Sequence, residues 1–194
     1  MDIHFLFFEN YETLDIFGPI EVFSSVEGAK LSYISLNGGP VKSRQGHEII
    51  TEPASSLKPG GVLVVPGGMG TRTLVQDEAF LSALKALCDQ SEFVLSICTG
   101  SGLLAKCGAL DHRRATSNKQ AFDWAKTTSD RVTWVKQARW VADGKFYTSS
   151  GVSAGIDMAL GFVCDRLGEA QAHGIARSME YLWNSDNTED AFCL

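Results

Sequence analysis

Residues 93–106 read FVLSICTGSGLLAK, and this stretch decides the fold because a strand pattern gives way to a helix pattern within it. The first five residues are apolar or small, as in a strand that is buried on both faces. A helical segment begins at Gly100 and ends near Gly108. Cys98 lies at the turn between the two, and small residues flank it, which is the arrangement of a nucleophile elbow.

That position suggests a chemistry for Cys98. A sharp turn from strand to helix strains the backbone and leaves the side chain standing over the sheet. Unpaired N–H groups at a helix N-terminus favour negative charge, so we expect the Cys98 thiolate to form more readily than that of a free cysteine. The local pattern equally fits a small hydrophobic residue that is buried at a strand end. Both interpretations stay open at this point.

Composition narrows the class of protein. A chain of 194 residues with 44% hydrophobic and 21% charged residues predicts one globular domain, residues 1–194, with a core of its own. The formal net charge is −6 and no run is rich in Lys or Arg, so we expect no nucleic-acid partner. No apolar stretch approaches the roughly 20 residues that span a bilayer, so we expect no membrane partner. The apolar run at 3–8 has no basic residue before it, unlike a signal peptide.

The cysteines and histidines indicate neither a disulfide framework nor a metal site. The chain has five cysteines, an odd number without paired spacing, which favours a reducing cytoplasm. None of the four histidines adjoins Cys98 or shows metal-ligand spacing. We therefore expect no metal.

Strand and helix patterns alternate along the chain, which predicts a mainly parallel sheet with helices on both faces. Ligands of such sheets bind outside the carboxyl ends of the strands, where Cys98, Asp15, Gly67–Gly68 and Ser150–Gly151 all fall. Strands are predicted at 3–8, 31–36, 61–65 and 93–97, extended runs around Val41 and at 47–51, and a hairpin that turns at Asp143–Gly144. Helices are predicted from about Pro19 to Ser25 and at 78–89, 100–106, 121–126, 154–167, the last with Ser153 as its N-cap, and 169–183.

Asp15 and two backbone segments are candidate partners of Cys98. Asp15 is predicted in a loop after the first strand, where its carboxylate can exchange a proton with the thiol or a bound water. Alternatively, Asp15 caps the helix that starts near Pro19. The N–H groups of Gly68 and Thr99 can donate to a developing negative charge, or residues 66–68 simply form a tight exit from a strand.

Five runs of sequence carry a resemblance to a known family, and the chain resembles the ThiJ/PfpI superfamily, which shares a fold with class I glutamine amidotransferases. The pattern around Asp15 and the Cys-Thr-Gly at Cys98 look like the isocyanide hydratase branch and the sensor domains of AraC-type regulators. The runs are LDIFGP at 14–19, VPGG at 65–68, SICTGS at 96–101, RRAT at 113–116 and GVSAGID at 151–157.

The resemblance implies a flavodoxin-like three-layer α/β sandwich, usually a homodimer. It implies Cys98 as nucleophile, Asp15 as its acid/base partner and Thr99 beside them, with Gly67, Gly68 and Gly151 as candidates for oxyanion or substrate binding. Protease and amidase members have His after the nucleophile where this chain has Thr99, and glyoxalase and deglycase types pair Glu with the cysteine, so those activities are disfavoured.

The branch often has Thr-Thr-His-Trp where this chain has Thr116-Ser117-Asn118-Lys119, which leaves the substrate open. A regulator needs further helix-turn-helix units, and none follow Leu194, so the resemblance allows at most a freestanding sensor domain.

The leading hypothesis is a cysteine-dependent enzyme that resembles isocyanide hydratase, a lyase that converts a small-molecule isocyanide and water into an N-substituted formamide through a Cys98 thioimidate. That mechanism requires no metal and no organic cofactor. A non-catalytic ligand or redox sensor, in which Cys98 oxidises to a sulfinate, is the alternative from another class. Another hydrolase or lyase on the same cysteine, of the glyoxalase or amidase kind, is the third. We also expect Cys98 to be alkylated before Cys88, Cys107 and Cys164. The aromatic residues of the hairpin, Trp140, Phe146 and Tyr147, exceed what an edge should expose and predict a homodimer.

Overall fold

A computed structural model of the protein describes residues 1–193. Its main feature is a central β-sheet. Within that range its eight strands are β1 (Asp2–Leu6), β2 (Lys30–Ser35), β3 (Gly39–Lys42), β4 (Glu48–Pro53), β5 (Val62–Val65), β6 (Phe93–Ser96), β9 (Trp140–Asp143) and β10 (Phe146–Ser149). Across the sheet they lie in the order β3-β4-β2-β1-β5-β6-β10-β9. The two edge pairs, β3–β4 and β10–β9, are antiparallel, and the other neighbours are parallel. Two short strands, β7 (Arg114–Ala115) and β8 (Thr133–Trp134), pair separately.

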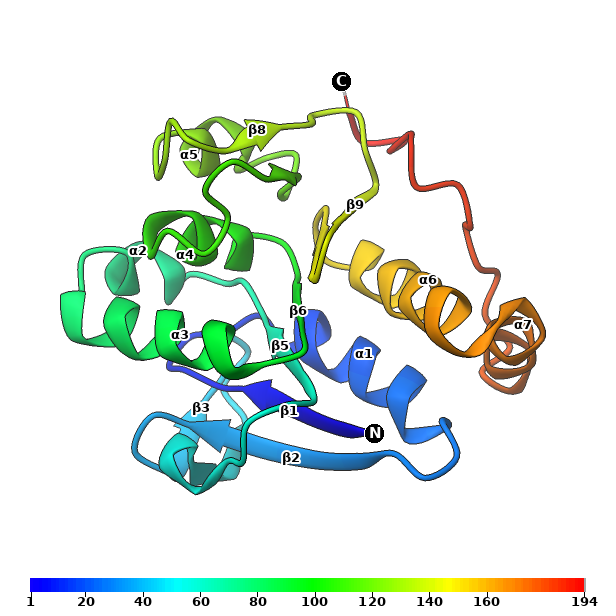
Figure 1. Cartoon of the computed structure of the whole chain (residues 1–194), viewed down its shortest axis with the longest axis horizontal. Coiled ribbons are helices and arrows are strands. Elements are labelled where there is room, and N and C mark those ends of the chain that lie inside the picture. Colours follow the sequence, from blue (N-terminus) through cyan, green and yellow to red (C-terminus); the bar gives the residue numbers. More distant parts are fainter. Residues whose placement is uncertain (194) are drawn as a thin grey trace.

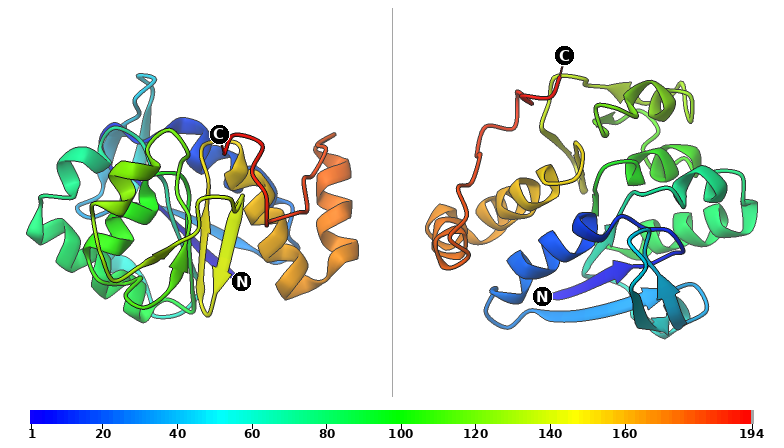
Figure 2. Two further views of the ribbon diagram at one scale, coloured as in Figure 1. Left: turned by 90° about the horizontal axis from the view of Figure 1, so that it is seen from above. Right: turned by 180° about the vertical axis from the view of Figure 1, so that it is seen from behind.

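Helices cover both faces of the sheet, so the predicted flavodoxin-like three-layer sandwich is confirmed (Figures 1 and 2). The helices are α1 (Thr13–Ser24), the 3-10 turn η1 (Ala54–Ser56), α2 (Thr71–Leu74), α3 (Glu78–Gln90), α4 (Gly100–Lys106), α5 (Phe122–Lys126), α6 (Ala154–Leu167) and α7 (Glu169–Ser178). Helices α1, α6 and α7 lie on one face, and α2, α3 and α4 lie on the other (Figure 1). No helix within residues 1–193 is long and apolar enough to cross a membrane.

The register of the sheet brings the site together. Val65 of β5 pairs with Ser96 of β6, and Ser96 pairs with Thr148 of β10, so three strands end at one level. Strands β5 and β10 are buried at every position and β6 at all but its first, as the apolar runs predict for strands that are covered on both faces. The segments that follow these strands therefore meet at one edge of the sheet.

Helix α1 corrects the prediction that the chain is a loop up to Pro19. The helix begins at Thr13, so Asp15 lies in its first turn and Pro19 lies inside it. Proline inside a helix removes one hydrogen bond. Ile16 before the proline and Val22 and Phe23 after it are all fully buried, so packing of one apolar face stabilises the helix on both sides.

One further boundary, the end of α7, differs from the prediction, and the predicted cap of α6 is only partly formed. Helix α7 ends at Ser178 rather than Trp183 because Glu180 takes a left-handed conformation, φ 51°, and the Tyr181 N–H bonds back to the Ala176 carbonyl. This is a helix-ending turn of the Schellman type. Ser153 does stand at the N-cap of α6, but its side chain makes no capping hydrogen bond.

The hairpin of β9 and β10 is confirmed, but its aromatic side chains do not lie on the surface. Trp140, Phe146 and Tyr147 are each at most 6% exposed within the single chain. Phe162 of α6 packs edge-on against Tyr147, at 5.2 Å between ring centroids. The expectation that these residues form a dimer contact is therefore wrong, because they are already buried within the single chain.

Candidate active site

The elbow at Cys98 is confirmed by its backbone. Cys98 has φ 58°, a left-handed value that is strained for a residue with a side chain. The Cys98 N–H donates to the Ser150 carbonyl at 3.1 Å. The Ser101 and Ser117 hydroxyls donate to the Cys98 carbonyl at 3.1 and 2.9 Å. Three bonds from three segments thus hold the strained turn in place.

Asp15 faces the same site from α1. Its Oδ2 accepts a hydrogen bond from the Gly67 N–H at 2.9 Å, and the carboxyl group is fully buried beside the Cys98 thiol. Oδ1 has no hydrogen-bond partner among residues 1–193. Asp15 does not cap α1, whose N-cap is Glu12.

Gly67 allows this close approach because it has no side chain. A Cβ at that position would lie 2.6 Å from the Thr99 nitrogen and 2.9 Å from Asp15 Oδ2. Any side chain would therefore push α1 and the elbow apart. Gly67 therefore has two roles: it lets α1 approach the elbow, and its N–H donates a hydrogen bond to Asp15.

The electrostatics of the pair differ from the expected low-pKa thiol. Burial raises the pKa of Asp15 to about 8, and the charge of Glu12 adds to that effect. Burial also raises the pKa of Cys98 well above its ordinary value, and the charge of Asp15 raises it further. Helix α4 is only seven residues long, so its dipole does not offset these effects. At neutral pH the resting pair therefore holds its protons.

Thr99 provides hydrogen-bond donors to the sulfur. Its N–H and its hydroxyl both act to lower the pKa of Cys98. The Gly68 N–H donates to Thr99 Oγ1 at 3.1 Å, and the Thr71 hydroxyl donates to the same oxygen at 3.1 Å. The Gly67 and Gly68 amides, expected to be oxyanion donors, thus already donate within the protein. The groups that face the sulfur belong to Thr99 and one further residue.

That further residue is Asn118, which sequence reasoning noted only as part of the pocket wall. The Ala121 N–H donates to Asn118 Oδ1 at 3.0 Å, which fixes the orientation of the carboxamide. Its amide nitrogen then lies against Gly151, where any Cβ would collide with it, and the side chain lowers the pKa of Cys98. Gly151 therefore makes room for a thiol-directed donor.

Arg72 was also missed, and it adds a positive charge to the site. Its guanidinium stacks on Trp124 with 3.5 Å to the ring centroid. Its Nη1 is buried and has no hydrogen-bond partner among the described residues. The charge interacts with Cys98, so Arg72 favours negative charge on the sulfur. Nothing in the local sequence TRTL points to this role, because the contact is made through the fold.

A pocket of about 440 Å³ adjoins Asn118 and Gly151. Apolar side chains and polar side chains, one of them the Lys119 amine, share its lining, so it suits a small molecule that has both an apolar and a polar part. The lining residues are Leu14, Asn118, Lys119, Gln120, Ser150, Gly151, Val152, Ser153 and Phe192.

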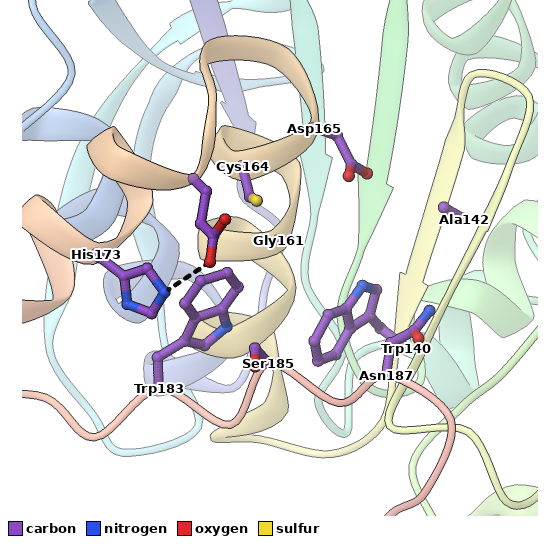
Figure 3. Close-up of a pocket in the computed structure, with 10 residues that line it drawn as sticks. Trp140, Ala142, Gly161, Cys164, Asp165, His173, Trp183, Ser185 and Asn187 are labelled. Atoms are coloured by element: carbon purple, nitrogen blue, oxygen red, sulfur yellow. Dashed lines mark ion pairs between the residues drawn. The ribbon is translucent and has the colours of Figure 1, made fainter.

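A second cavity, of about 250 Å³, lies elsewhere, over α6 and the start of α7 (Figure 3). Figure 3 shows the indoles of Trp140 and Trp183 on either side of it, with Cys164 between them and His173 paired with Glu169 at 3.5 Å. None of the predicted site residues lines it. Within residues 1–193 no cluster of three His, Cys, Asp or Glu side chains could hold a metal ion.

The model of the DJ-1/PfpI family matches residues 1–164 of this chain. The chain belongs to the DJ-1/PfpI family. An isonitrile hydratase from Pseudomonas putida is 31% identical to this family member over 189 residues, which are 93% of the chain and 78% of the relative. The solved structure of a ThiJ/PfpI family protein from Pseudomonas syringae superposes with a TM-score of 0.84 at 28% identity, covering 93% of this chain and 74% of the other.

A regulator also resembles this DJ-1/PfpI protein. The HTH-type transcriptional regulator CdhR from Pseudomonas aeruginosa is 34% identical over 142 residues, which are 73% of this chain. The match spans only 40% of that regulator's length. The family thus includes relatives named as an enzyme and relatives named as regulators.

Proposed function

We propose that this DJ-1/PfpI protein is a cysteine-dependent isocyanide hydratase, which adds water to an isocyanide to give an N-substituted formamide. The observation that carries the proposal is the buried pair of Cys98 and Asp15, in which a carboxyl group with a pKa of about 8 can both give and take a proton. The similarity to a hydratase of isonitriles, the same class of compound, supports the choice of substrate.

The resting pair holds two protons, so the first step starts from the form of the pair that has released one of them. With the proton on Asp15 and the charge on sulfur, Cys98 attacks the terminal carbon of the isocyanide and forms a C–S bond. Asp15 gives its proton to that same carbon. The product is a thioimidate, R–N=CH–S–Cys, and Asp15 is left as a carboxylate. Donors from Thr99 and Asn118 stabilise the thiolate before the attack.

The second step uses water and restores the enzyme. Asp15 takes a proton from a water molecule as the water oxygen attacks the thioimidate carbon, and then gives that proton to the substrate nitrogen. The tetrahedral adduct loses its hydroxyl proton to Asp15, the C–S bond breaks, and the formamide leaves. The charge returns to Cys98 and the proton to Asp15, so the sum is isocyanide plus water to formamide. Cys98, Asp15 and water account for every step, and the proposal includes no cofactor.

A turnover screen of small isocyanides, α-oxoaldehydes and amides tests the proposal. We expect formamide to appear from an isocyanide, and no turnover of the other two classes. Formamide production can be followed by NMR of the formyl proton. Absence of isocyanide turnover together with turnover of another class would assign the same thiol to a different hydrolase or lyase.

The likeness to CdhR supports a second candidate function, a ligand or redox sensor. In that role Cys98 is oxidised to a sulfinate, and Asp15 donates a hydrogen bond to it. If no substrate class turns over and peroxide yields a stable Cys98 sulfinate, the sensor role replaces the hydratase.

We further propose a cytoplasmic homodimer, on the strength of the family resemblance. The side chains of Leu14 and Phe17 on α1 are 42% and 37% exposed, so they offer an apolar contact. Light scattering that gives a mass near 21.0 kDa at micromolar concentration would contradict the dimer.

A further inference from the structure

Two cysteines outside the site lie side by side at the ends of neighbouring helices. Cys88 is in the last turn of α3 and is fully buried, and Cys107 is the C-cap of α4 and is partly exposed. The two helices pack against each other on one face of the sheet (Figure 1). The Cys88 and Cys107 side chains lie close enough to shift each other's pKa, and the Cys107 thiol donates to the Leu104 carbonyl at 3.3 Å. The two sulfurs are therefore neighbours.

The surroundings favour negative charge on Cys107 rather than on Cys88. The Cys88 side chain lowers the pKa of Cys107, and the Ala109 N–H and the Lys85 ammonium group lower it further against the opposing effect of burial. The Cys107 side chain in turn raises the pKa of Cys88 well above its ordinary value, and burial adds to the rise. Cys107 is therefore the accessible nucleophile, and Cys88 is the neighbour that keeps its proton.

We propose that Cys88 and Cys107 form a redox-active dithiol, which a hydroperoxide converts into an intramolecular disulfide. The Cys107 thiolate attacks one peroxide oxygen, the O–O bond breaks, and a sulfenic acid forms while the leaving oxygen takes up a proton. The Cys88 sulfur then attacks the sulfenic sulfur, an S–S bond forms, the S–OH bond breaks, and water leaves. With hydrogen peroxide, two thiols are oxidised to one disulfide while the peroxide is reduced to two molecules of water.

The position of the pair gives this chemistry a structural consequence. A disulfide would join the C-terminal end of α3 to the C-terminal end of α4, and Cys98 lies just before the other end of α4. The elbow cysteine is nearly covered, whereas Cys107 is partly open to solvent. Peroxide therefore meets the dithiol first, and the modification site is separate from the proposed catalysis at Cys98.

Peptide mapping of the peroxide-treated full chain tests the proposal. Free thiols are blocked with N-ethylmaleimide, and the chain is cut at Lys, Arg and Glu, which places Cys88, Cys98 and Cys107 on the separate peptides 86–92, 93–106 and 107–113. We expect a cross-link between 86–92 and 107–113 that dithiothreitol reverses. A cross-link that contains 93–106 instead, or sulfinic acid on Cys107 without any cross-link, would overturn the proposal.

Two single variants test whether Cys88 is the thiol that reacts with oxidised Cys107. In Cys88→Ser the sulfenic acid on Cys107 has no thiol to react with, so its adduct with dimedone should rise several-fold over the wild type. Cys164→Ser is the matched control, because it removes a thiol from α6 and should leave the cross-link unchanged. Equal dimedone adduct in the wild type and Cys88→Ser would show that Cys88 does not resolve Cys107. The wild-type cross-link decides the matter even if Cys88→Ser folds poorly.

Discussion

Cys98 and Cys107 lie at opposite ends of one short helix, α4. The pKa shift of each thiol is opposite to the shift that the helix dipole alone would cause. The dipole favours a thiolate before the N-terminus, at Cys98, and disfavours one at the C-terminus, at Cys107. The structure instead raises the pKa of Cys98 through burial and the Asp15 charge, and lowers the pKa of Cys107 through the neighbouring Cys88 side chain. Burial, neighbouring charge and direct donors thus outweigh the dipole of a seven-residue helix.

The comparison of Cys98 with Cys107 shows that a cysteine that ionises readily need not be the one that is suited to catalysis. Ionisation of Cys107 is favoured by its neighbour Cys88, whereas that of Cys98 is opposed by burial and by the charge of Asp15. A thiol that ionises only together with its acid partner is suited to reactions in which a proton must be delivered to the substrate. The chemical difference between the two cysteines therefore comes from their neighbouring side chains, Asp15 and Cys88, and not from the helix end at which each lies.

The largest expected effect comes from removing the sulfur of the elbow. Cys98→Ala should reduce isocyanide turnover to the uncatalysed rate, since no other group holds the adduct. Cys107→Ser is the matched control at the other end of α4 and should keep wild-type turnover. Initial rates of formamide production measure both. Residual turnover in Cys98→Ala, or a comparable loss in Cys107→Ser, would break the division of roles.

Asp15→Asn should separate proton transfer from thiol ionisation. The amide keeps the shape but cannot exchange the proton, so turnover should fall about 10²-fold or more. The same change removes the charge that raises the pKa of Cys98, so above pH 8 iodoacetamide should alkylate Cys98 faster than in the wild type. Glu21→Gln, an exposed position on α1, is the control. Loss of turnover with slower alkylation would mean that Asp15 activates the thiol as a base instead.

The sequence predicted the parts of the site that depend on local pattern. The change from strand to helix located Cys98, and alternation of apolar runs predicted the sheet that brings β5, β6 and β10 to one level. Asp15 does lie beside Cys98, but in a helix rather than in the predicted loop, because burial on both sides of Pro19 cannot be inferred from the proline itself.

The missed features depend on long-range contacts. Asn118 reaches the thiol because Gly151, far along the chain, leaves room for its carboxamide. Arg72 acts on the sulfur only because Trp124 holds its guanidinium. The pKa of Cys98 itself follows from depth of burial, which no local pattern contains. Sequence patterns therefore predicted which residues meet, and the structure showed which charges they carry.

The order of alkylation should reverse the expectation from sequence. At neutral pH we expect iodoacetamide to label Cys107 several-fold faster than Cys98, because the rate follows the thiolate fraction and access. The peptides 107–113 and 93–106 report the two sites in one digest. Faster labelling of Cys98 would restore the helix-terminus explanation and would remove the contrast between the two ends of α4.

The smallest expected effect is on stability, and it isolates the Asp15 charge from any chemistry. Because the folded-state pKa of Asp15 is about 8 and its ordinary value is 3.8, the folded chain holds a proton that the unfolded chain has lost between those pH values. Folding then becomes less favourable as pH rises, by up to about 1.4 kcal/mol per pH unit from this group alone. Asp15→Asn removes the titrating group, so its free energy of unfolding should fall less than that of the wild type between pH 5 and pH 8. Urea titrations at several pH values measure the difference, and parallel slopes for the two proteins would show that Asp15 is already charged in the folded state, which would also remove the carboxyl group as the proton donor to the substrate carbon.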